Sequence, residues 1–390
     1  MVYDIVIIGG GASGMVAAIN AARKRCSVVI CERLPVLGKK ILACGGGRCN
    51  LSHDRLDEST YNQEARPLVK SVFKRFGEEQ SAVFFQSIGL RTYTQEGRVF
   101  PVTDQASSVL KVLEMELNRL NVTQETHFDV IEVKRSAKGF DILSRSRKSV
   151  VGKKLIFAAG GRSYPALGSN GSCYEFAVQL GHHIVPPVPS AVPLVLKDQL
   201  CHFLQGQKIP AHAKAFVGDI QVAEASGEIL FTKYGLSGTA ILDVSEPISI
   251  ALHRHGRKDI FIEVDMVPFL TRDDLERELL DRSKKGIAME DILAGFLPNK
   301  WGLISKHTSL QSLPDLLKSK RFTVLDTRGW NEAEFTAGGI SVEEVREETL
   351  ESKIVPQLFF CGEILDVQGK RGGYNLAWAW ASGWVAGDGC

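Results

Sequence analysis

Short apolar runs, separated by glycine-rich turns and helix-compatible stretches, set the pattern at the start of the chain. Residues 3–8 and 27–31 are almost continuously apolar or β-branched, which is typical of strands buried on both faces of a parallel sheet. Residues 15–25 are rich in alanine and compatible with a helix. A strand, a glycine turn, a helix and a second strand within about 30 residues predict a βαβ unit.

Later segments alternate between the two periodicities. Apolar residues at helical spacing indicate helices, whereas short alternating or β-branched runs indicate strands. The predicted helices lie at residues 64–90, 105–121, from Thr271 onward, 289–297, 309–319 and 376–386. The predicted strands lie within residues 126–151, 154–159, 191–266, 321–326 and 357–361. The alternating runs in 191–266, which follow a proline cluster, favour an antiparallel or barrel-like β domain.

The composition is that of an ordinary globular protein. The 390 residues are 44% hydrophobic and 24% charged, which excludes a disordered chain and a disulfide-dense scaffold. A net charge of +2 gives no support to nucleic-acid binding as the main task. The chain shows no signal peptide and no bilayer-spanning stretch, and its eight cysteines are scattered. We therefore expect a cytoplasmic protein with reduced thiols, a small-molecule substrate and no nucleic-acid or membrane partner.

Glycine is concentrated in a few loops. Of the 37 glycines, 16 lie in the windows 9–14, 38–47, 160–171 and 362–373. In the first window, Gly9, Gly11 and Gly14 form the pattern G-x-G-x-x-G between a predicted strand and a predicted helix, and Glu32 follows the next strand. This context predicts a dinucleotide site: the helix N-terminus at Ala12 and Ser13 receives phosphate, and the carboxylate receives ribose hydroxyls.

The second window favours FAD over NAD. A carboxylate at Glu32 suits either cofactor and disfavours the 2′-phosphate of NADP. Residues 38–50 form a polyglycine loop with basic residues, which can wrap the ribityl pyrophosphate of FAD. A solvent loop would explain the glycines of this segment but not the adjacent Arg48 and Asn50.

Several sequence blocks occur in an order that resembles one family. The blocks are residues 38–50, 159–165, 168–171, 227–232, 235–238, 336–340, 362–366 and 372–376. They resemble the aminoacetone-oxidase-like, three-domain bacterial flavoproteins. The chain departs from the family pattern at Cys44, where serine is usual, and at Lys233, where histidine is frequent. It also lacks the usual acidic residue in the block 171–174.

The resemblance implies an α/β fold whose main domain is discontinuous. A glutathione-reductase-type, Rossmann-like FAD domain with a parallel sheet would comprise residues 1–189 and 339–390. A β-barrel-like insert would comprise residues 190–268 and 320–338, and a nested small helical domain residues 269–319. FAD would be bound non-covalently. The candidate cofactor-binding residues are Gly9, Gly11, Ala12, Ser13, Gly14, Glu32, Arg33, Lys39, Lys40, Gly46, Gly47, Arg48, Cys49, Asn50, Val130, Ala159, Gly160, Gly161, Gly362, Glu363, Asp366, Gly373, Tyr374, Asn375 and Leu376.

The resemblance also implies an activity. The leading hypothesis is an oxidase of small amines, similar to aminoacetone, that is reoxidised by O₂ to give H₂O₂. The alternatives are an NAD(P)H-dependent flavin reductase acting on an enone-type substrate and, without catalysis, a flavin-dependent or RNA-associated binding protein. Catalytic residues cannot be derived from the sequence, and loop position alone makes Lys233, Tyr234 and Arg371 candidates for the substrate side.

Two further residue sets are candidates for chemical sites. Cys44 and Cys49 are spaced C-x₄-C, as in disulfide reductases of the related fold, but the chain has neither a second dinucleotide motif nor a C-terminal His and Glu pair to support that chemistry. The histidines at 182–183 and at 253 and 255 are too local to form a metal shell, and we expect surface or loop positions for them. No metal site is predicted.

Overall fold

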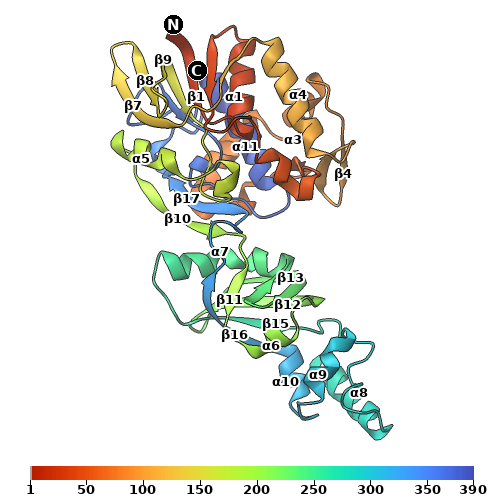
Figure 1. The fold of residues 1–390 in the computed structure, drawn as a ribbon. Coiled ribbons are helices and arrows are strands. Elements are labelled where there is room, and N and C mark those ends of the chain that lie inside the picture. Colours follow the sequence, from red (N-terminus) through yellow and green to blue (C-terminus); the bar gives the residue numbers. More distant parts are fainter. Residues whose placement is uncertain (1) are drawn as a thin grey trace. The chain divides into compact units, whose positions relative to one another are not determined.

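The computed structural model describes residues 2–390 as two compact units (Figure 1). The first unit contains residues 2–187 and 335–390, so both the beginning and the end of the described chain belong to it. The second unit contains residues 188–334. The α/β fold class predicted from the sequence is confirmed, whereas the exact limits of three domains remain a proposal.

A mainly parallel sheet forms the centre of the first unit. Strand β1 (Val2–Ile8) pairs in parallel with β2 (Val28–Cys31) and with β9 (Ser149–Phe157). Strand β18 (Leu358–Phe360), from the other end of the chain, pairs in parallel with β9. The remaining strands of this sheet are β6 (Thr123–Glu125), β7 (Val130–Ser136) and β8 (Gly139–Ser144).

Two helices from opposite ends of the chain pack directly against each other in this unit (Figure 1). They are α1 (Ala12–Arg23) and α11 (Tyr374–Gly389). A Cβ on Gly383 would overlap the Ser13 carbonyl oxygen, and a Cβ on Gly387 would overlap that of Ala17. The two glycines therefore allow backbone-to-backbone contact, which Asn20 strengthens by donating a side-chain hydrogen bond of 2.8 Å to the Trp384 carbonyl.

The other elements of the first unit surround this core. The predicted helix 64–90 is two helices, interrupted at Gly77, where a Cβ would lie 2.9 Å from the Phe73 carbonyl oxygen. Helix 105–121 is confirmed as α4. The elements are α2 (Arg66–Arg75), α3 (Glu78–Ser87), α4 (Ala106–Arg119), α5 (Ser172–Gln179), the small sheet of β3 (Ser52–His53), β4 (Thr92–Gln95) and β5 (Arg98–Pro101), and β17 (Phe335–Ile340), which pairs with β10 (Ile184–Ser190).

His182 lies in the loop between α5 and β10, as expected from the sequence, but its side chain is buried rather than at the surface. Its Nδ1 lies 2.9 Å from a Glu344 carboxylate oxygen and its Nε2 lies 2.8 Å from the Ser352 hydroxyl. The Ser352 oxygen also accepts the backbone N–H groups of Ile354 and Val355. The imidazole thus joins two loops in the interior, where both of its nitrogens need partners.

A closed antiparallel barrel forms the centre of the second unit. Its strand order is β11-β14-β13-β12-β15-β16. Alternate residues of β12 point inward, and the buried Ala211, Ala213 and Ala215 let the strands close around a narrow interior. The strands are β11 (Leu194–Leu196), β12 (Lys208–Val217), β13 (Ile220–Thr232), β14 (Gly235–Ser237), β15 (Ile260–Asp265) and β16 (Lys320–Thr327).

Helix α7 (Thr239–His253) lies within residues 191–266, where the sequence pattern predicted a barrel-like β domain and no helix was assigned, and it buries Ile241, Val244 and Ile248 at helical spacing. One expectation for this unit was wrong. Residues 289–297, expected to be helical, form turns instead, with Gly295 in the left-handed region at φ 84°. The other helices are α6 (Gln199–Phe203), α8 (Arg272–Lys284), α9 (Gly302–Ser305) and α10 (Leu313–Lys318).

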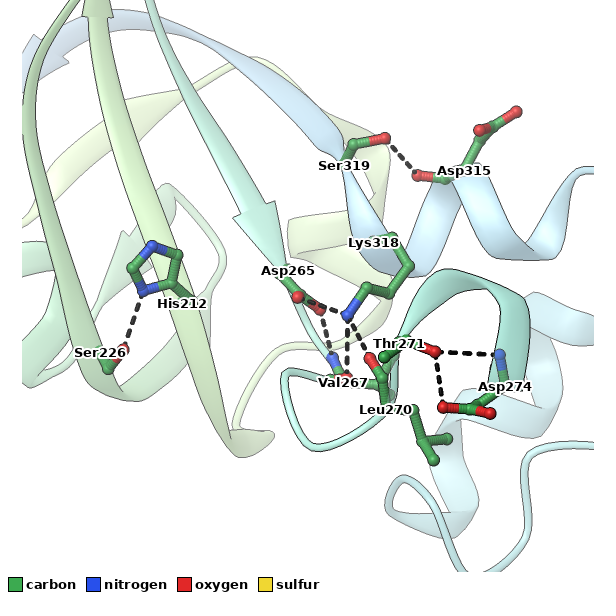
Figure 2. Close-up of polar contacts among 10 residues, drawn as sticks. All are labelled: His212, Ser226, Asp265, Val267, Leu270, Thr271, Asp274, Asp315, Lys318 and Ser319. Carbon is green, nitrogen blue, oxygen red and sulfur yellow. Dashed lines mark hydrogen bonds and ion pairs between the residues drawn. The ribbon is translucent and has the colours of Figure 1, made fainter. Parts of the chain in front are cut away.

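Figure 2 shows how α10 is joined to the barrel. The ammonium group of Lys318 donates to the Asp265 carboxylate and the Leu270 carbonyl, both at 2.6 Å, and to the Val267 carbonyl at 3.3 Å. Thr271 caps the start of α8 by accepting the Asp274 N–H, which agrees with the helix predicted from Thr271 onward. The Lys318 side chain therefore fixes the segment between β15 and α8.

Within residues 2–390, neither a membrane-spanning helix nor a cluster of metal-binding side chains is present. None of the helices in this range is both long enough and apolar enough to cross a membrane. The same range holds no group of three or more His, Cys, Asp or Glu side chains arranged to bind a metal ion.

Candidate functional site

The glycine turn after β1 is closed by backbone contacts. A Cβ on Gly9, which has φ 106°, would overlap the Ala158 carbonyl, and a Cβ on Gly14 would overlap the Gly9 carbonyl oxygen. A Cβ on Gly11, in contrast, would meet no atom of residues 2–390 within 4 Å. Two glycines therefore serve the packing of the turn, while Gly11 faces open space at the start of α1.

The start of α1 is suited to an anion. Gly11 is the N-cap and offers no side-chain acceptor to the helix. The first-turn N–H groups, from Ala12 onward, consequently have no partner inside the helix. Together with the helix dipole they favour a phosphate group in the open space beside Gly11.

Glu32 closes the other side of the turn. One of its carboxylate oxygens accepts the Gly10 N–H and the other accepts the Leu34 N–H, both at 2.8 Å. The side chain is almost fully buried at the end of β2. A carboxylate held in this way beside a phosphate-binding turn suits the ribose hydroxyls of an adenine dinucleotide.

Glu363, which follows β18, is the centre of a second polar cluster. Its carboxylate pairs with the Lys40 ammonium at 2.9 Å and accepts the Thr336 N–H at 2.8 Å. It also accepts the Ser163 hydroxyl at 3.2 Å and the Gly161 N–H at 3.3 Å. The cluster unites three of the four glycine windows with β17, because Lys40, Gly161 and Glu363 come from windows far apart in the sequence.

The start of α11 lies against the segment that follows the polyglycine loop. Gly373 has φ 107°, and a Cβ there would overlap the Ser52 carbonyl and lie 2.9 Å from Asn50 Oδ1. The Tyr374 ring stacks on His53 at 4.8 Å between centroids. Helix α11 begins without a side-chain cap, so its first N–H groups also have no partner inside the helix.

Buried polar atoms show that these turns can receive a ligand. The side-chain oxygens of Asn50 and Gln368 are buried and accept no hydrogen bond from any group in residues 2–390. Leaving such an atom without a partner costs about 1–3 kcal/mol. The two oxygens, the open space at Gly11 and the uncapped helices α1 and α11 fit a nucleotide with phosphates and a ring edge that donates hydrogen bonds.

Comparison with known proteins decides the family. Residues 3–389 match the family described as HI0933-like protein Rossmann domain. The chain belongs to the HI0933-like family. FAD is the cofactor of this chain, and the chain is an FAD-dependent oxidoreductase.

Relatives are similar over the whole chain. The 3-dehydro-bile acid delta(4,6)-reductase of Clostridium scindens is 38% identical over 405 residues, which cover 98% of each chain. A ribosomal RNA dihydrouridine synthase of Escherichia coli is 30% identical over 406 residues, which cover 98% of this chain and 96% of that one. The solved 3-ketosteroid-delta4-(5alpha)-dehydrogenase of Rhodococcus jostii is 14% identical with a TM-score of 0.52, covers 99% of this chain and 96% of its own, and shows the fold alone.

The structure brings many of the predicted cofactor residues together. The turns at Gly9–Gly14 and Gly362–Glu363 meet, since a Cβ on Gly362 would lie 2.5 Å from the Ser13 hydroxyl. The predicted residues in these connected turns are Gly9, Gly11, Ala12, Ser13, Gly14, Glu32, Lys40, Ala159, Gly160, Gly161, Gly362 and Glu363. The predicted residues at or against the start of α11 are Asn50, Gly373, Tyr374, Asn375 and Leu376. Their individual contacts with FAD remain a proposal.

Other predicted residues are engaged elsewhere. The Arg48 guanidinium bonds the Asp104 carboxylate at 3.0 Å and the Tyr93 hydroxyl at 2.7 Å, and it lies over the Phe100 ring. Arg33 lies 3.8 Å from an Asp129 carboxylate oxygen. Neither arginine is joined to the Glu363 cluster by these contacts. The remaining candidates are Lys39, which donates to the Ala166 carbonyl, Gly46 and Gly47 in the polyglycine turn, the buried Cys49, Val130 at the start of β7, and Asp366.

Three residues without a predicted role take part in the site. Ser163 and Thr336 bind Glu363, and Thr336 also accepts the backbone N–H groups of Arg162 and Ser163. Gln368 presents the buried oxygen described above. Ser163 and Thr336 lie in the blocks that carry the family resemblance, and that resemblance was the one sequence signal for them.

The catalytic candidates are divided between the two units. Lys233 is exposed in the turn between β13 and β14. Tyr234 lies beneath the Arg328 guanidinium, and its hydroxyl is 3.5 Å from a Glu332 carboxylate oxygen. Burial, followed by the charge of Glu332, raises the pKa of Tyr234. Arg371 belongs to the first unit and directly precedes the glycines that begin α11.

Proposed function

We propose that the chain is an FAD-dependent reductase of a carbon–carbon double bond conjugated with a carbonyl group. The observation that carries this proposal is the 38% identity, over nearly the whole of both chains, with a 3-dehydro-bile acid delta(4,6)-reductase. That name describes the reduction of unsaturated bonds in an oxidised steroid. The enone reductase that the sequence left as an alternative therefore becomes the leading function.

The chemistry assigns distinct tasks to cofactor and chain. Bound FAD would supply the hydride-transfer chemistry for such a reduction. A proton must reach the neighbouring carbon, and the carbonyl oxygen needs a hydrogen-bond donor while negative charge develops on it. Arg371, Tyr234 and Lys233 carry suitable donors and are proposed, each separately, for the substrate side.

An anaerobic experiment on the FAD-loaded protein tests the proposal. NADH or NADPH should bleach the flavin absorption, and a 3-oxo-4,6-diene steroid added afterwards should restore it. A steroid that lacks the carbonyl group is the matched control and should leave the flavin reduced. The flavin can be reduced by either nicotinamide or by a chemical reductant. If the dienone reoxidises the flavin in none of these cases, the proposal is contradicted.

The oxidase of small amines with O₂ as acceptor, expected from the sequence resemblance, is a competing proposal. It predicts that anaerobic aminoacetone bleaches the flavin and that admitted O₂ restores it with release of H₂O₂. The same cuvette therefore separates the two activities. Bleaching by aminoacetone without any reaction with nicotinamides or dienone would replace the reductase proposal with this one.

Reduction of uridine in ribosomal RNA is a second candidate, because the dihydrouridine synthase is 30% identical over nearly the whole chain. The charge distribution does not favour a polyanion: residues 188–334 carry 18 Lys and Arg against 20 Asp and Glu. Nucleoside mass spectrometry of ribosomal RNA treated with the reduced protein tests this activity. A new nucleoside two hydrogens heavier than uridine would establish it.

A further inference from the structure

The polyglycine turn brings two thiols together. Cys44 and Cys49 flank Gly45, Gly46 and Gly47, whose φ values of 58°, 65° and 91° reverse the chain. The Cys49 N–H consequently donates to the Cys44 carbonyl at 3.0 Å. A backbone hydrogen bond between the two residues brings their α-carbons near the spacing of about 4–7 Å that a disulfide requires. The Cys44 thiol donates to the carbonyl of Asn50, the residue after Cys49, at 3.8 Å.

The two thiols differ in access and in protonation. Cys49 is fully buried, whereas Cys44 is partly exposed. The hydrogen bond with Cys44, followed by burial, holds the pKa of Cys49 far above its usual range. Cys44 is therefore the thiol that a dissolved reagent can reach, whereas Cys49 resists deprotonation.

We propose that Cys44 and Cys49 form a redox site that closes to an intramolecular disulfide by exchange with a small dissolved disulfide. The Cys44 thiolate attacks one sulfur of the reagent, forms a mixed disulfide and releases one thiolate. Cys49 then attacks the Cys44 sulfur, loses its proton and releases the second thiolate. In sum, two protein thiols are oxidised by two electrons and one disulfide is reduced to two thiols.

This site differs from the disulfide-reductase chemistry that the sequence disfavours, because its oxidant is a dissolved disulfide and no electron transfer with FAD is required. The turn nevertheless adjoins the cofactor site. Asn50 follows Cys49 directly, and its buried side-chain oxygen faces Gly373 at the start of α11. Closure of the disulfide should therefore alter the surroundings of the flavin.

Peptide mapping of the FAD-loaded protein tests the pair directly. Trypsin cleaves after Lys40, Arg48 and Arg55, so it places Cys44 in peptide 41–48 and Cys49 in peptide 49–55. After incubation with excess oxidised glutathione and alkylation of the remaining thiols, these two peptides should be recovered as one disulfide-linked species. Reduced glutathione in excess should restore the two alkylated peptides, and the flavin absorption spectrum should change and recover in parallel.

Three variants keep the test decisive. Cys49→Ser should trap glutathione on Cys44 as a mixed disulfide, and Cys44→Ser should leave Cys49 unmodified and the flavin spectrum unchanged by oxidant. Cys26→Ser, which lies outside the turn, should form the linked pair as the parent protein does. Glutathionylation of Cys26 in the parent protein shows that the oxidant is active. If peptides 41–48 and 49–55 are recovered only in alkylated form under those conditions, the proposal is overturned.

Discussion

The two units of the molecule differ in the features that define their candidate sites. In the first unit, the cofactor site depends on backbone positions that admit no side chain, such as Gly9 and Gly14, and on one carboxylate, Glu363, bound by groups from distant segments. In the second unit, the candidate substrate residues Lys233 and Tyr234 lie on one short turn of a barrel. The proposed cofactor site is thus defined by conformational constraints on the backbone, whereas the proposed substrate residues are side chains that can be exchanged without changing the fold.

The strongest test of this contrast is a pair of glycine variants. Gly14→Ala places a methyl group on the Gly9 carbonyl oxygen, so we expect the apo-protein to lose about 2–3 kcal/mol of stability to overpacking. Gly11→Ala is the control: it should leave apo-protein stability within about 0.5 kcal/mol and yet weaken FAD binding, because its methyl group occupies the open space beside α1. Denaturant titration and FAD titration measure the two effects. Equal stability loss in both variants would contradict the assignment.

A second prediction concerns Glu363. Glu363→Gln keeps the shape but removes the charge that pairs with Lys40, and we expect a loss of about 1.5–3 kcal/mol in stability and weaker FAD retention. The exposed Glu343→Gln, in the same unit, should change neither quantity. Thermal unfolding and the ratio of flavin to protein absorbance report the outcome. Unchanged FAD retention in Glu363→Gln would remove this cluster from the cofactor site.

A third prediction tests the second unit. Tyr234→Phe removes a hydroxyl that interacts at 3.5 Å with Glu332. FAD content should be unchanged, while turnover of the enone substrate should fall about tenfold, equivalent to about 1.4 kcal/mol. Steady-state kinetics and the flavin absorbance ratio separate these effects. Loss of FAD in this variant would break the division between cofactor and substrate functions.

The smallest expected effect is a pH dependence confined to the first unit. Burial, although opposed by Glu344, lowers the pKa of His182, so the folded protein binds this proton less tightly than the unfolded chain does. Stability is therefore fully present above the unfolded value of about 6.5 and should decline as the pH falls below it. His182→Gln should remove this part of the slope. An identical slope in unfolding titrations of both proteins would contradict the assignment.

Much of the first unit could be predicted from the sequence, since its strands and helices carry strong local signals. The βαβ unit, α4, β18 and α11 lie where the hydrophobic pattern places them. Helix α7 was not predicted from the sequence, because its β-branched Ile241 and Val244 and its internal Pro247 are atypical of helices. The non-helical backbone of Phe76 and Gly77 similarly divides α2 from α3, which the apolar periodicity did not reveal.

Only the part of the candidate site that depends on local backbone conformation could be predicted from the sequence. The roles of Gly9, Gly14 and Glu32 follow from local spacing. The partner of Arg48 is Asp104, which lies 56 residues away, and no local pattern could indicate that the charge of this arginine is engaged there. Ser163, which follows β9, and Thr336, on β17, acquire their roles only when the fold brings them to Glu363, which follows β18.

The most direct test of the central claim is the mass of the product from a single turnover. The FAD-loaded protein, reduced anaerobically with one equivalent of NADPH or NADH, is mixed with a 3-oxo-4,6-diene steroid and analysed by liquid chromatography and mass spectrometry. The proposed reductase activity predicts a product two hydrogens heavier than the substrate, in an amount equal to the reduced flavin. Unchanged steroid beside a flavin that remains reduced would contradict it.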